Sequence, residues 1–245
     1  MTPNNPLTLP NSPLCVIVGA GPGNGMALAR QFQRDGYRVA LIARNISKMQ
    51  KHIAEMADTS NVFAYSADVT HPEQIEAVFT LLQEHHGEVE VLIYNAGNAA
   101  FDNIENASVN TLENTWKTNV RGLFLASRQV LTGMQKRRSG NIVVIGATAS
   151  VKASANFMSF TSAKGAQRHL AMSMAKHLGP HNIHVSYLII DGVIDTPMTR
   201  GFLPGKPDDY FLQADAIAGS AAHLVQQPPN AWTFELDIRP FAESW

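Results

Sequence analysis

The sequence has very little cysteine and almost no net charge. Among its 245 residues there is a single cysteine, Cys15, so the chain cannot form an internal disulfide. Its formal net charge of −1 at pH 7 gives no electrostatic reason to expect nucleic acid or an anionic membrane as a partner. Cys15 lies in an apolar run typical of a strand, which favours a small buried core residue over a reactive thiol.

Long hydrophobic runs are also missing. The longest apolar stretches, such as residues 185–190, have the length of a strand and are far too short to span a bilayer. Residues 1–13 are rich in proline and asparagine and contain no apolar stretch of signal-peptide length. We therefore expect these residues to form a flexible tail, and we expect a cytoplasmic protein with no membrane partner.

What the sequence does contain is a regular alternation of short β-branched runs and longer amphipathic segments. This alternation predicts a parallel sheet covered by helices on both faces. With right-handed crossovers, the expected fold is α/β, a Rossmann-type doubly wound parallel β-sheet of about seven strands in a single domain, residues 14–245. The expected strands are 14–18, 38–42, 62–66, 89–94, 140–145, 183–190 and 232–237, and the expected helices are 23–35, 47–58, 72–86, 112–137, 159–178 and 214–227.

The segment 191–212 lacks a clean period and is rich in glycine, proline and aspartate. It follows the sixth expected strand, which places it at the carboxyl edge of the sheet, where ligands bind in such folds. We interpret it as a mobile substrate loop, and a purely structural loop is the alternative.

A glycine-rich turn follows the first expected strand. Residues 19–25 read GAGPGNG, and an expected helix comes next. A turn without side chains lets the backbone approach a pyrophosphate, and the helix N-terminus offers N–H groups to it. Asn24 occupies the third glycine position of G-x-G-x-x-G, so the spacing fits G-x-x-x-G-x-G through Gly19, Gly23 and Gly25. We predict that these four residues bind a nucleotide; a purely structural turn is the alternative.

The end of the second expected strand indicates which nucleotide. Residues 41–45 read LIARN and contain no carboxylate that would hold the ribose 2′-hydroxyl of NAD. The guanidinium of Arg44 suits a 2′-phosphate, because its planar fork matches phosphate oxygens. The sequence therefore favours NADP(H) over NAD(H), unless Arg44 is only a solvated surface charge.

Further short motifs follow the glycine pattern along the chain: Asp68-Val69, Asn95-Ala96-Gly97, Asn119 and Lys164. Their order and spacing resemble the short-chain dehydrogenase/reductase family over nearly the whole chain after the tail. By this resemblance Asp68, followed by Val69, is expected to contact the adenine. The same resemblance implies that Asn95, Ala96 and Gly97 line the cofactor cleft.

The resemblance also implies roles near the reacting atoms. Lys164 is expected to hydrogen-bond the nicotinamide ribose, and Asn119 to hold a water in a proton relay. Val193 and Thr196 lie in the stretch VIDTPM, residues 193–198, which matches a cofactor-binding stretch of the family. The alternatives are an ordinary polar helix residue at Asn119 and a surface lysine at Lys164.

Two positions depart from the family at its reaction site. The family's mechanism uses a tyrosine that exchanges the substrate proton and a serine that orients the carbonyl. Phe160 stands four residues before Lys164, at the tyrosine position, and Ala147 stands at the serine position. Phe157 occupies the position where some enoyl reductases carry their tyrosine, and Asp191-Gly192 replaces the usual Pro-Gly.

These departures resemble a divergent branch of the family that lacks the active-site tyrosine and is described only as oxidoreductases. The stretch GATAS at 146–150 and the ending WTFELDIRP at 232–240 carry that resemblance. A proton must then come from another group. Thr148 and Ser150, directly after the fifth expected strand, are the favoured candidates, ahead of Tyr210 from the loop and of Ser159 and Ser162, which we expect on a helix surface.

Three functions remain open on this basis. The first is an NADP(H)-dependent oxidoreductase that keeps Asn119 and Lys164 and transfers a hydride to or from a small carbonyl, alcohol or enone with a non-standard proton donor. The second is a non-catalytic nucleotide-binding or scaffold protein, and the third is a lyase or isomerase without net redox. The nine histidines have no cysteine or acidic residue beside them at metal-ligand spacing, so we expect no metal site.

The resemblance also implies assembly. Members of the family pair the helices expected at 112–137 and 159–178 across a two-fold axis, which predicts a homodimer or homotetramer. Leu123, Phe124, Met172 and Met174 are apolar residues of these helices that belong either to such an interface or to the core.

Overall fold

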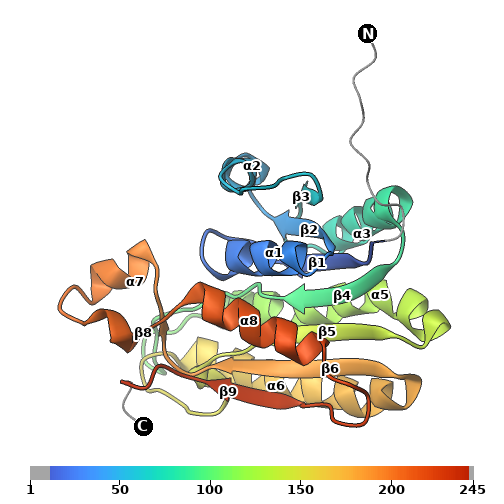
Figure 1. Ribbon diagram of the computed structural model, residues 1–245. Coiled ribbons are helices and arrows are strands. Elements are labelled where there is room, and N and C mark those ends of the chain that lie inside the picture. The colour runs from blue at the N-terminus through green and yellow to red at the C-terminus, as the bar shows by residue number, and fades with distance from the viewer. Residues whose placement is uncertain (1–11, 243–245) are drawn as a thin grey trace.

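The computed structural model describes residues 12–242, so most of the expected tail, residues 1–11, lies outside the described residues. A seven-stranded parallel sheet forms the centre of the molecule (Figure 1). Its strands are β1 (Leu14–Val18), β2 (Arg38–Ala43), β3 (Val62–Ser66), β4 (Val89–Tyr94), β5 (Gly140–Ile145), β6 (Ile183–Ile190) and β9 (Glu235–Ile238).

The order of the strands positions the site. Across the sheet they run β3-β2-β1-β4-β5-β6-β9, and every neighbouring pair is parallel. The chain builds outward from β1 to β3 and then returns to β4 on the other side of β1. The carboxyl ends of β1 and β4 therefore flank the switch point of a doubly wound sheet, which is where such folds bind ligands. The predicted Rossmann-type fold is confirmed.

Helices cover both faces of the sheet, and each face has its own hydrophobic core. The helices are α1 (Asn24–Arg34), α2 (Ile46–Ala54), α3 (Pro72–His86), α4 (Val109–Trp116), α5 (Gly122–Arg137), α6 (Met158–Leu178) and α8 (Ala214–Val225). One core joins the sheet to Phe79 of α3, Leu123 of α5 and Ala171 of α6. The other joins it to Phe32 of α1 and Ile217 of α8, the two helices in the foreground of Figure 1.

Three expected elements differ from the structure by three residues or more at an end. The helix expected at 112–137 begins earlier, at Val109, because the Ser108 side chain caps it by accepting from the Thr111 backbone N–H at 3.0 Å. It also contains a π-helical turn, Lys117–Arg121, and the helix expected at 47–58 already ends at Ala54. The last strand begins at Glu235, and Trp232, expected as its first residue, stacks on His184 with ring centroids 4.8 Å apart.

The segment 191–212 has local structure that its sequence did not indicate. It contains the short strands β7 (Val193–Ile194) and β8 (Phe211–Leu212), which pair in parallel, and between them helix α7 (Pro197–Phe202). Figure 1 shows this segment projecting at the end of the sheet to which the strand arrows point.

The burial of five single residues bears on the expectations from the sequence. Cys15, Tyr94 and Tyr187 are fully buried, as expected for core residues. The expectation that Ser159 lies on the helix surface is wrong, because its hydroxyl is buried and donates to the carboxylate of Asp102. Leu123 is fully buried and belongs to the core.

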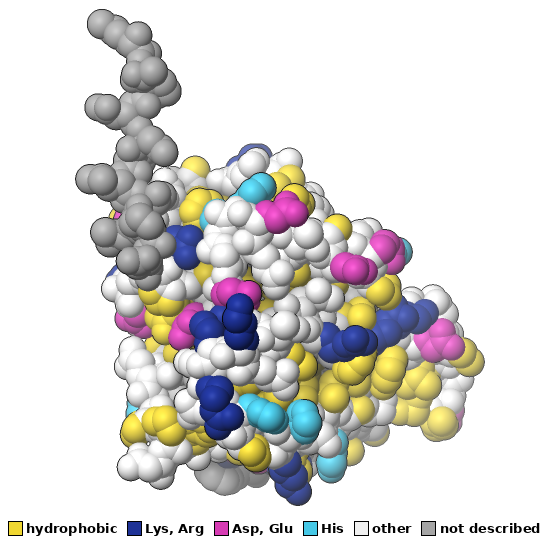
Figure 2. Space-filling view, turned by 90° about the vertical axis from the view of Figure 1, so that its right-hand side faces the viewer, with side chains coloured by type: hydrophobic (Ala, Val, Ile, Leu, Met, Phe, Trp, Pro, Cys, Tyr) yellow, Lys and Arg dark blue, Asp and Glu magenta, His cyan; other side chains and the backbone are white. Residues whose placement is uncertain are grey.

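One face of the molecule carries side chains of every kind. Figure 2 shows basic, acidic, histidine and hydrophobic side chains interspersed on one face of the molecule. Within residues 12–242, no helix combines the length and the hydrophobicity needed to cross a membrane.

Candidate functional site

A cleft of about 530 Å³ lies at the carboxyl edge of the sheet, at the switch point between β1 and β4. Seven of the predicted cofactor residues line it, contributed by the segments that follow four different strands: Gly19, Arg44, Asp68, Val69, Asn95, Ala96 and Gly97. The fold therefore brings together residues that are far apart in the sequence. Thr70, Asn98, Asn114 and Thr118 also line the cleft and were not predicted.

Gly19 closes the turn after β1 against the segment after β4. Its φ is +87°, and a Cβ there would lie 2.3 Å from the Cα of Ala96. Its carbonyl accepts a hydrogen bond from the Asn95 side-chain amide at 2.7 Å, and the Asn95 backbone N–H donates to the Val18 carbonyl at 2.9 Å. Only glycine fits this approach, so the backbone of the turn stays bare where it borders the cleft.

The rest of the glycine-rich turn leads into α1. A Cβ at Gly25 would lie 2.7 Å from the Cα of Ala20, so this glycine keeps the turn tight. No side chain caps the helix at Gly23, and the buried Oδ1 of Asn24 has no hydrogen-bond partner among the described residues. An uncapped helix N-terminus beside a bare turn fits a pyrophosphate group.

Thr196 lies against the same turn from the other side. A Cβ at Gly23 would lie 3.4 Å from the Cγ2 of Thr196, so the predicted residues Gly23 and Thr196 are neighbours. Val193 is half-buried in β7, three residues earlier. Thus the segment 191–212 contacts the glycine-rich turn directly.

Arg44 and Asp68 mark the far end of the cleft. Arg44 is exposed and directly follows β2, while the Asp68 carboxylate accepts from the Thr70 N–H at 2.9 Å and from the Thr70 hydroxyl at 2.8 Å. Burial raises the pKa of Asp68, but the two Thr70 hydrogen bonds and the Arg44 charge outweigh it and lower the pKa below its ordinary value. This end therefore offers an ionised carboxylate beside a guanidinium.

Asn119 lies in the π-helical turn between α4 and α5 and is fully buried. Its side-chain amide donates to the carbonyls of Asn98 and Thr115, each at 2.9 Å, and its Oδ1 has no partner among the described residues. A π-turn changes the pairing of helix carbonyls, and such turns are frequent at functional sites. Here the Asn119 carbonyl accepts a hydrogen bond from the Gln167 side chain at 2.7 Å.

Lys164 is not a surface lysine. It is 4% exposed, and its ammonium donates to the Ile145 carbonyl at 2.8 Å and to the Gln167 side-chain oxygen at 2.6 Å. Burial lowers the pKa of Lys164 from 10.5 to about 7. Gln167 joins Lys164 to the backbone of Asn119, and sequence reasoning missed it, although its spacing of three residues from Lys164 places the two on one helix face.

The two departures from the family flank this lysine. Phe160 lies one turn before Lys164 on α6, and Ala147 lies two residues beyond Ile145, the last residue of β5. Both side chains are half-buried, and neither carries a group that can exchange a proton. The structure thus places a methyl and a phenyl group at the two positions singled out in the sequence.

Most of the candidate proton donors have other partners. The Ser150 hydroxyl donates to the Ala147 carbonyl, the Ser162 hydroxyl donates to the Ser159 carbonyl at 3.0 Å, and Ser159 donates to Asp102. Tyr210 lies under the ammonium of Lys206, 4.2 Å from its ring centroid. Thr148 lies beyond the carboxyl end of β5, and its hydroxyl also has partners, the Ile190 carbonyl at 3.4 Å and the Asp191 carboxylate.

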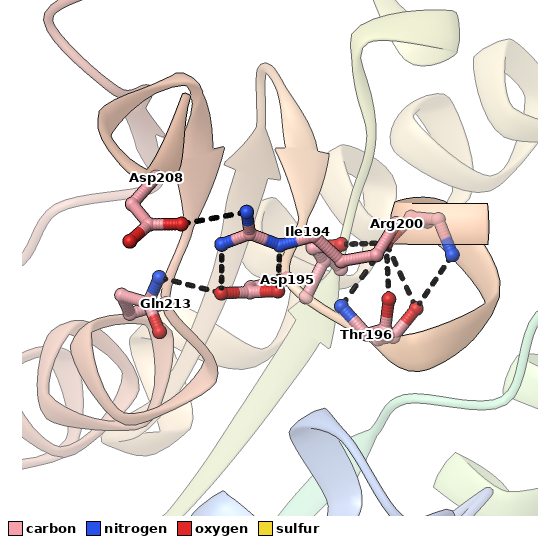
Figure 3. Close-up of polar contacts among 7 residues, drawn as sticks. Ile194, Asp195, Thr196, Arg200, Asp208 and Gln213 are labelled. Carbon is pink, nitrogen blue, oxygen red and sulfur yellow. Dashed lines mark hydrogen bonds and ion pairs between the residues drawn. The ribbon is translucent and has the colours of Figure 1, made fainter. Parts of the chain in front are cut away.

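An arginine clasp holds the segment 191–212 together (Figure 3). Arg200 donates to both Asp195 carboxylate oxygens at 2.8 Å and to Asp208 at 2.7 Å, and its guanidinium lies 4.1 Å from the centroid of the Phe211 ring. These hydrogen bonds lower the pKa of Asp195 to about 2. The side chain of Thr196 also accepts from the Thr199 N–H in a capping box at the start of α7. Sequence reasoning missed the clasp because its partners come from separate turns of an aperiodic segment.

Removing the clasp is expected to loosen the segment and weaken cofactor binding. Arg200→Met leaves Asp195 and Asp208 without their shared cation, so Thr196 loses its fixed position against the glycine-rich turn. We expect faster proteolysis within 191–212 and several-fold weaker NADPH binding in a fluorescence titration. The matched control is Arg30→Met, which removes the exposed pair with Asp215; equal behaviour of the two variants would contradict this role of Arg200.

Lys164→Met is expected to stabilise the fold at neutral pH. Because the Lys164 pKa falls from 10.5 to about 7 on folding, the unfolded chain binds the extra proton between these values, and this group makes the free energy of unfolding rise with pH across that window. Below about pH 7 the buried lysine is protonated at a cost in desolvation. Lys164→Met removes that cost and raises the free energy of unfolding by roughly 1–3 kcal/mol. Urea unfolding near neutral and near pH 9.5 measures it, with Lys176→Met as the exposed control; an unchanged pH slope in Lys164→Met would contradict the shift.

Metal chemistry finds no support in the side chains. Within residues 12–242, no group of three or more histidine, cysteine, aspartate or glutamate side chains is arranged to hold a metal ion. His184 is buried, hydrogen-bonds the Thr233 carbonyl at 2.9 Å and stacks on Trp232, which is a structural role.

Comparison with known proteins agrees with this architecture. The sequence matches the model of the short chain dehydrogenase family over residues 14–206. It is 24% identical to an uncharacterized oxidoreductase of Staphylococcus aureus (strain USA300), over 96% of this chain and 100% of that protein. An uncharacterized oxidoreductase of Staphylococcus epidermidis is 25% identical, over 93% of this chain and 96% of that one.

Solved structures agree as well. A short-chain dehydrogenase from Rhodopseudomonas palustris is 31% identical with a TM-score of 0.81, covering 94% of this chain and 100% of that chain. An alcohol dehydrogenase from the archaeon Thermococcus sibiricus, complexed with 5-hydroxy-NADP, is 26% identical with a TM-score of 0.84, covering 96% and 99% of the two chains.

Proposed function

The chain belongs to the short-chain dehydrogenase family, and from that premise we propose that it is an NADP(H)-dependent oxidoreductase acting on a small carbonyl, alcohol or enone. The observation that carries this proposal is the cleft at the switch point, which Arg44 borders at the end of β2, where no carboxylate stands. A guanidinium there suits the 2′-phosphate that distinguishes NADP from NAD. The Thermococcus alcohol dehydrogenase with its bound 5-hydroxy-NADP supports the same choice of cofactor.

The residues of the cleft fit such a dinucleotide from end to end. Asp68 and Val69 would receive the adenine, and the bare turn at Gly19 with the uncapped start of α1 would receive the pyrophosphate. Asn95, Ala96 and Gly97 line the cleft, and Val193 and Thr196 would approach the cofactor from the segment 191–212, where Thr196 lies against Gly23. When bound, NADPH supplies a hydride, and the chain supplies position and electrostatics.

Lys164 and Asn119 do not line the cleft, but the Asn119 side chain donates to the carbonyl of Asn98, which does, and Gln167 joins Lys164 to Asn119. The Lys164 ammonium is fixed by Ile145 and Gln167, so it can donate a further hydrogen bond to a nicotinamide ribose without moving. The unpartnered Oδ1 of Asn119, 3.6 Å from where a Cβ of Gly97 would stand, faces the same region. Ala147 and Phe160 support the proposal that the chain belongs to a divergent branch that lacks the family's usual serine and tyrosine.

The test of this function is stoichiometric oxidation of NADPH across a panel of aldehydes, ketones, dicarbonyls and enones. We expect turnover with at least one class, followed as loss of nicotinamide absorbance with formation of the reduced product. Tight NADPH binding without turnover of any class would reject the oxidoreductase and leave the cofactor site standing.

A non-catalytic nucleotide-binding protein is the second candidate, because both Ala147 and Phe160 lack an exchangeable proton. Reproducible turnover by the wild-type chain rejects it. A lyase or isomerase that uses the pocket without net redox would convert substrate with no change in nicotinamide absorbance, so the same assay, read by product analysis, separates all three.

We also propose a homodimer or homotetramer built on the long helices. Several large apolar side chains remain exposed on α4 and α5: Val109, Leu112, Trp116 and Phe124. Covering them in an oligomer would remove apolar surface from water. Sedimentation that finds a monomer at micromolar concentration would reject this assembly.

A further inference from the structure

A charged cluster that the cofactor does not account for lies at the carboxyl ends of β5, β6 and β9. Its centre is Asp191, which directly follows β6 and stands where the family usually has proline. The Asp191 carboxylate lies 3.3 Å from the ammonium of Lys152 and 3.3 Å from the guanidinium of Arg239. Arg239 follows β9, and Lys152 lies in the turn after β5.

The burial within this cluster is uneven. The side chain of Asp191 is only 6% exposed, whereas that of Lys152 is 51% exposed. A carboxylate buried at a strand end is costly unless it is paired, and well-packed apolar residues are often as stabilising as such a pair. Burial raises the pKa of Asp191, but hydrogen bonds from Thr148 and Lys152 and the charges of Lys152 and Arg239 outweigh it, so its pKa is lowered and it stays ionised. A buried anion thus fixes a cation whose other side faces solvent.

The cluster adjoins the position of the missing serine. Thr148, the residue after Ala147, hydrogen-bonds Asp191 through its hydroxyl. The Lys152 backbone N–H donates to the Thr148 carbonyl at 2.9 Å, so the short helical turn Thr148–Ser150 folds the chain back over the end of β5. The Lys164 ammonium binds the Ile145 carbonyl at the end of the same strand. The strand end that lacks the usual donors therefore lies between two lysines, one buried and one half-exposed.

We propose that Lys152 is the catalytic proton donor of this protein, and that Asp191 and Thr148 are the residues that position its ammonium. The inference rests on the proposed oxidoreductase function and names its missing acid. An ammonium carries three N–H donors. One is directed at Asp191, so the group can bind Asp191 and present another N–H to a substrate oxygen at the same time.

The proposed reduction of a carbonyl to an alcohol balances in protons and electrons. When bound, NADPH would supply a hydride to the carbonyl carbon of the substrate, and Lys152 would supply a proton to its oxygen as one N–H bond breaks and an O–H bond forms. The neutral amine then regains a proton from water, which reaches it because the side chain is half-exposed. The sum is carbonyl, NADPH and one proton giving alcohol and NADP⁺.

The activity test compares three variants with NADPH and the activated dicarbonyl phenanthrenequinone. Lys152→Gln is expected to lower kcat about 100-fold, within the range for loss of a general acid, with NADPH affinity unchanged. Lys152→Arg keeps the charge and the pair with Asp191 but does not release its proton, so it should be as slow. Lys51→Gln, on the exposed surface of α2, should match the wild type. Full activity of Lys152→Arg would show a merely structural role and overturn the proposal.

A second readout does not depend on turnover. Peptide mass spectrometry measures acetylation of lysines by acetic anhydride with and without saturating NADP⁺ and phenanthrenequinone. Acetylation of Lys152 should slow several-fold in the complex, while that of Lys51 should not change. Unchanged acetylation of Lys152 in a wild type that turns over overturns the proposal for Lys152 and leaves the proposed function intact. No turnover by a wild type that binds NADPH, or no binding of NADPH at all, overturns the proposed function and the role of Lys152 with it.

Asp191→Asn tests the positioning role. It should lower kcat with KM nearly unchanged, because the ammonium is still present but no longer held. A change in KM alone, or no change in either constant, would reject a positioning role for Asp191 and would leave the conclusion about Lys152 unaffected.

Discussion

Replacing Gly19 by alanine is expected to abolish NADPH binding and to destabilise the fold by roughly 3 kcal/mol or more, because it forces an overlap between two backbone segments. The φ of +87° already disfavours a side chain at this residue. The new Cβ would lie 2.3 Å from the Cα and 2.4 Å from the backbone nitrogen of Ala96, and backbone atoms cannot rotate away as a side chain can. Relief would require β1 and β4 to separate at the point where the cleft begins.

The matched control lies two residues further on. A Cβ at Gly21 meets no atom within 4 Å, and its φ lies outside the left-handed region. Gly21→Ala should therefore unfold in urea much as the wild type does and keep most of its NADPH affinity. Equal effects of the two substitutions would mean that the turn is not packed against Ala96 as described.

The second large effect is a gain of activity. In the Lys152→Gln background, which lacks the proposed donor, the double variant Ala147→Ser with Phe160→Tyr is expected to raise carbonyl reduction by about 100-fold or more, the usual contribution of a positioned proton donor. The phenol would stand one helical turn from the Lys164 ammonium, and the hydroxyl would stand at the end of β5. Steady-state kinetics with phenanthrenequinone measure the gain.

The single substitutions and a displaced phenol serve as controls. Residues that act as a unit are far from additive, so Ala147→Ser or Phe160→Tyr alone should give only part of the effect. Phe63→Tyr adds a phenol to a half-buried residue of β3, at the opposite edge of the sheet from β9, and should give none. In the Lys152→Gln background, Phe160→Tyr should restore turnover, since it supplies a donor by another route. No gain in the double variant despite NADPH binding would mean that the pocket itself differs from the family's.

The sequence predicted the sheet, and it singled out residues that the fold brings together in one cleft, for physical reasons that are local. Buried parallel strands such as Ile183–Ile190 are continuous apolar runs, and they stand out from amphipathic helices without knowledge of neighbours. The order of the strands then follows from right-handed crossovers, and the carboxyl edge brings Gly19, Asp68 and Asn95 into one cleft.

What the sequence did not reveal depends on contacts between distant segments. Gln167 joins Lys164 to Asn119 only because α6 packs against the π-helical turn, and no local pattern marks that turn. The sequence gives no sign that the charges of Arg200, Asp195 and Asp208 form one cluster. The pairing of β7 with β8 holds together the segment that carries them. Ser159 reads as a surface residue because its partner, Asp102, lies 57 residues away in the chain.

Near Lys164, the sequence lacks the family's two reacting groups while the fold keeps costly buried charged residues. Ala147 and Phe160 remove the two groups that the resemblance implies, while Lys164 keeps a buried, costly amine with its pKa at about 7. A chain that had simply lost its function would have no need of a buried lysine, nor of a buried carboxylate at Asp191. Their presence is the reason for proposing altered chemistry in place of a silent scaffold.

The measurement that tests the account most directly is a calorimetric titration of the wild type and of Arg44→Ala with NADPH and with NADH. The account predicts that the wild type binds NADPH at least about tenfold more tightly than NADH, a difference of about 1.4 kcal/mol, which one charge-assisted contact supplies. Arg44→Ala should bind both nucleotides with the weaker affinity. Equal affinities in the wild type, or no binding of either nucleotide, would contradict the central claim that this cleft is an NADP(H) site.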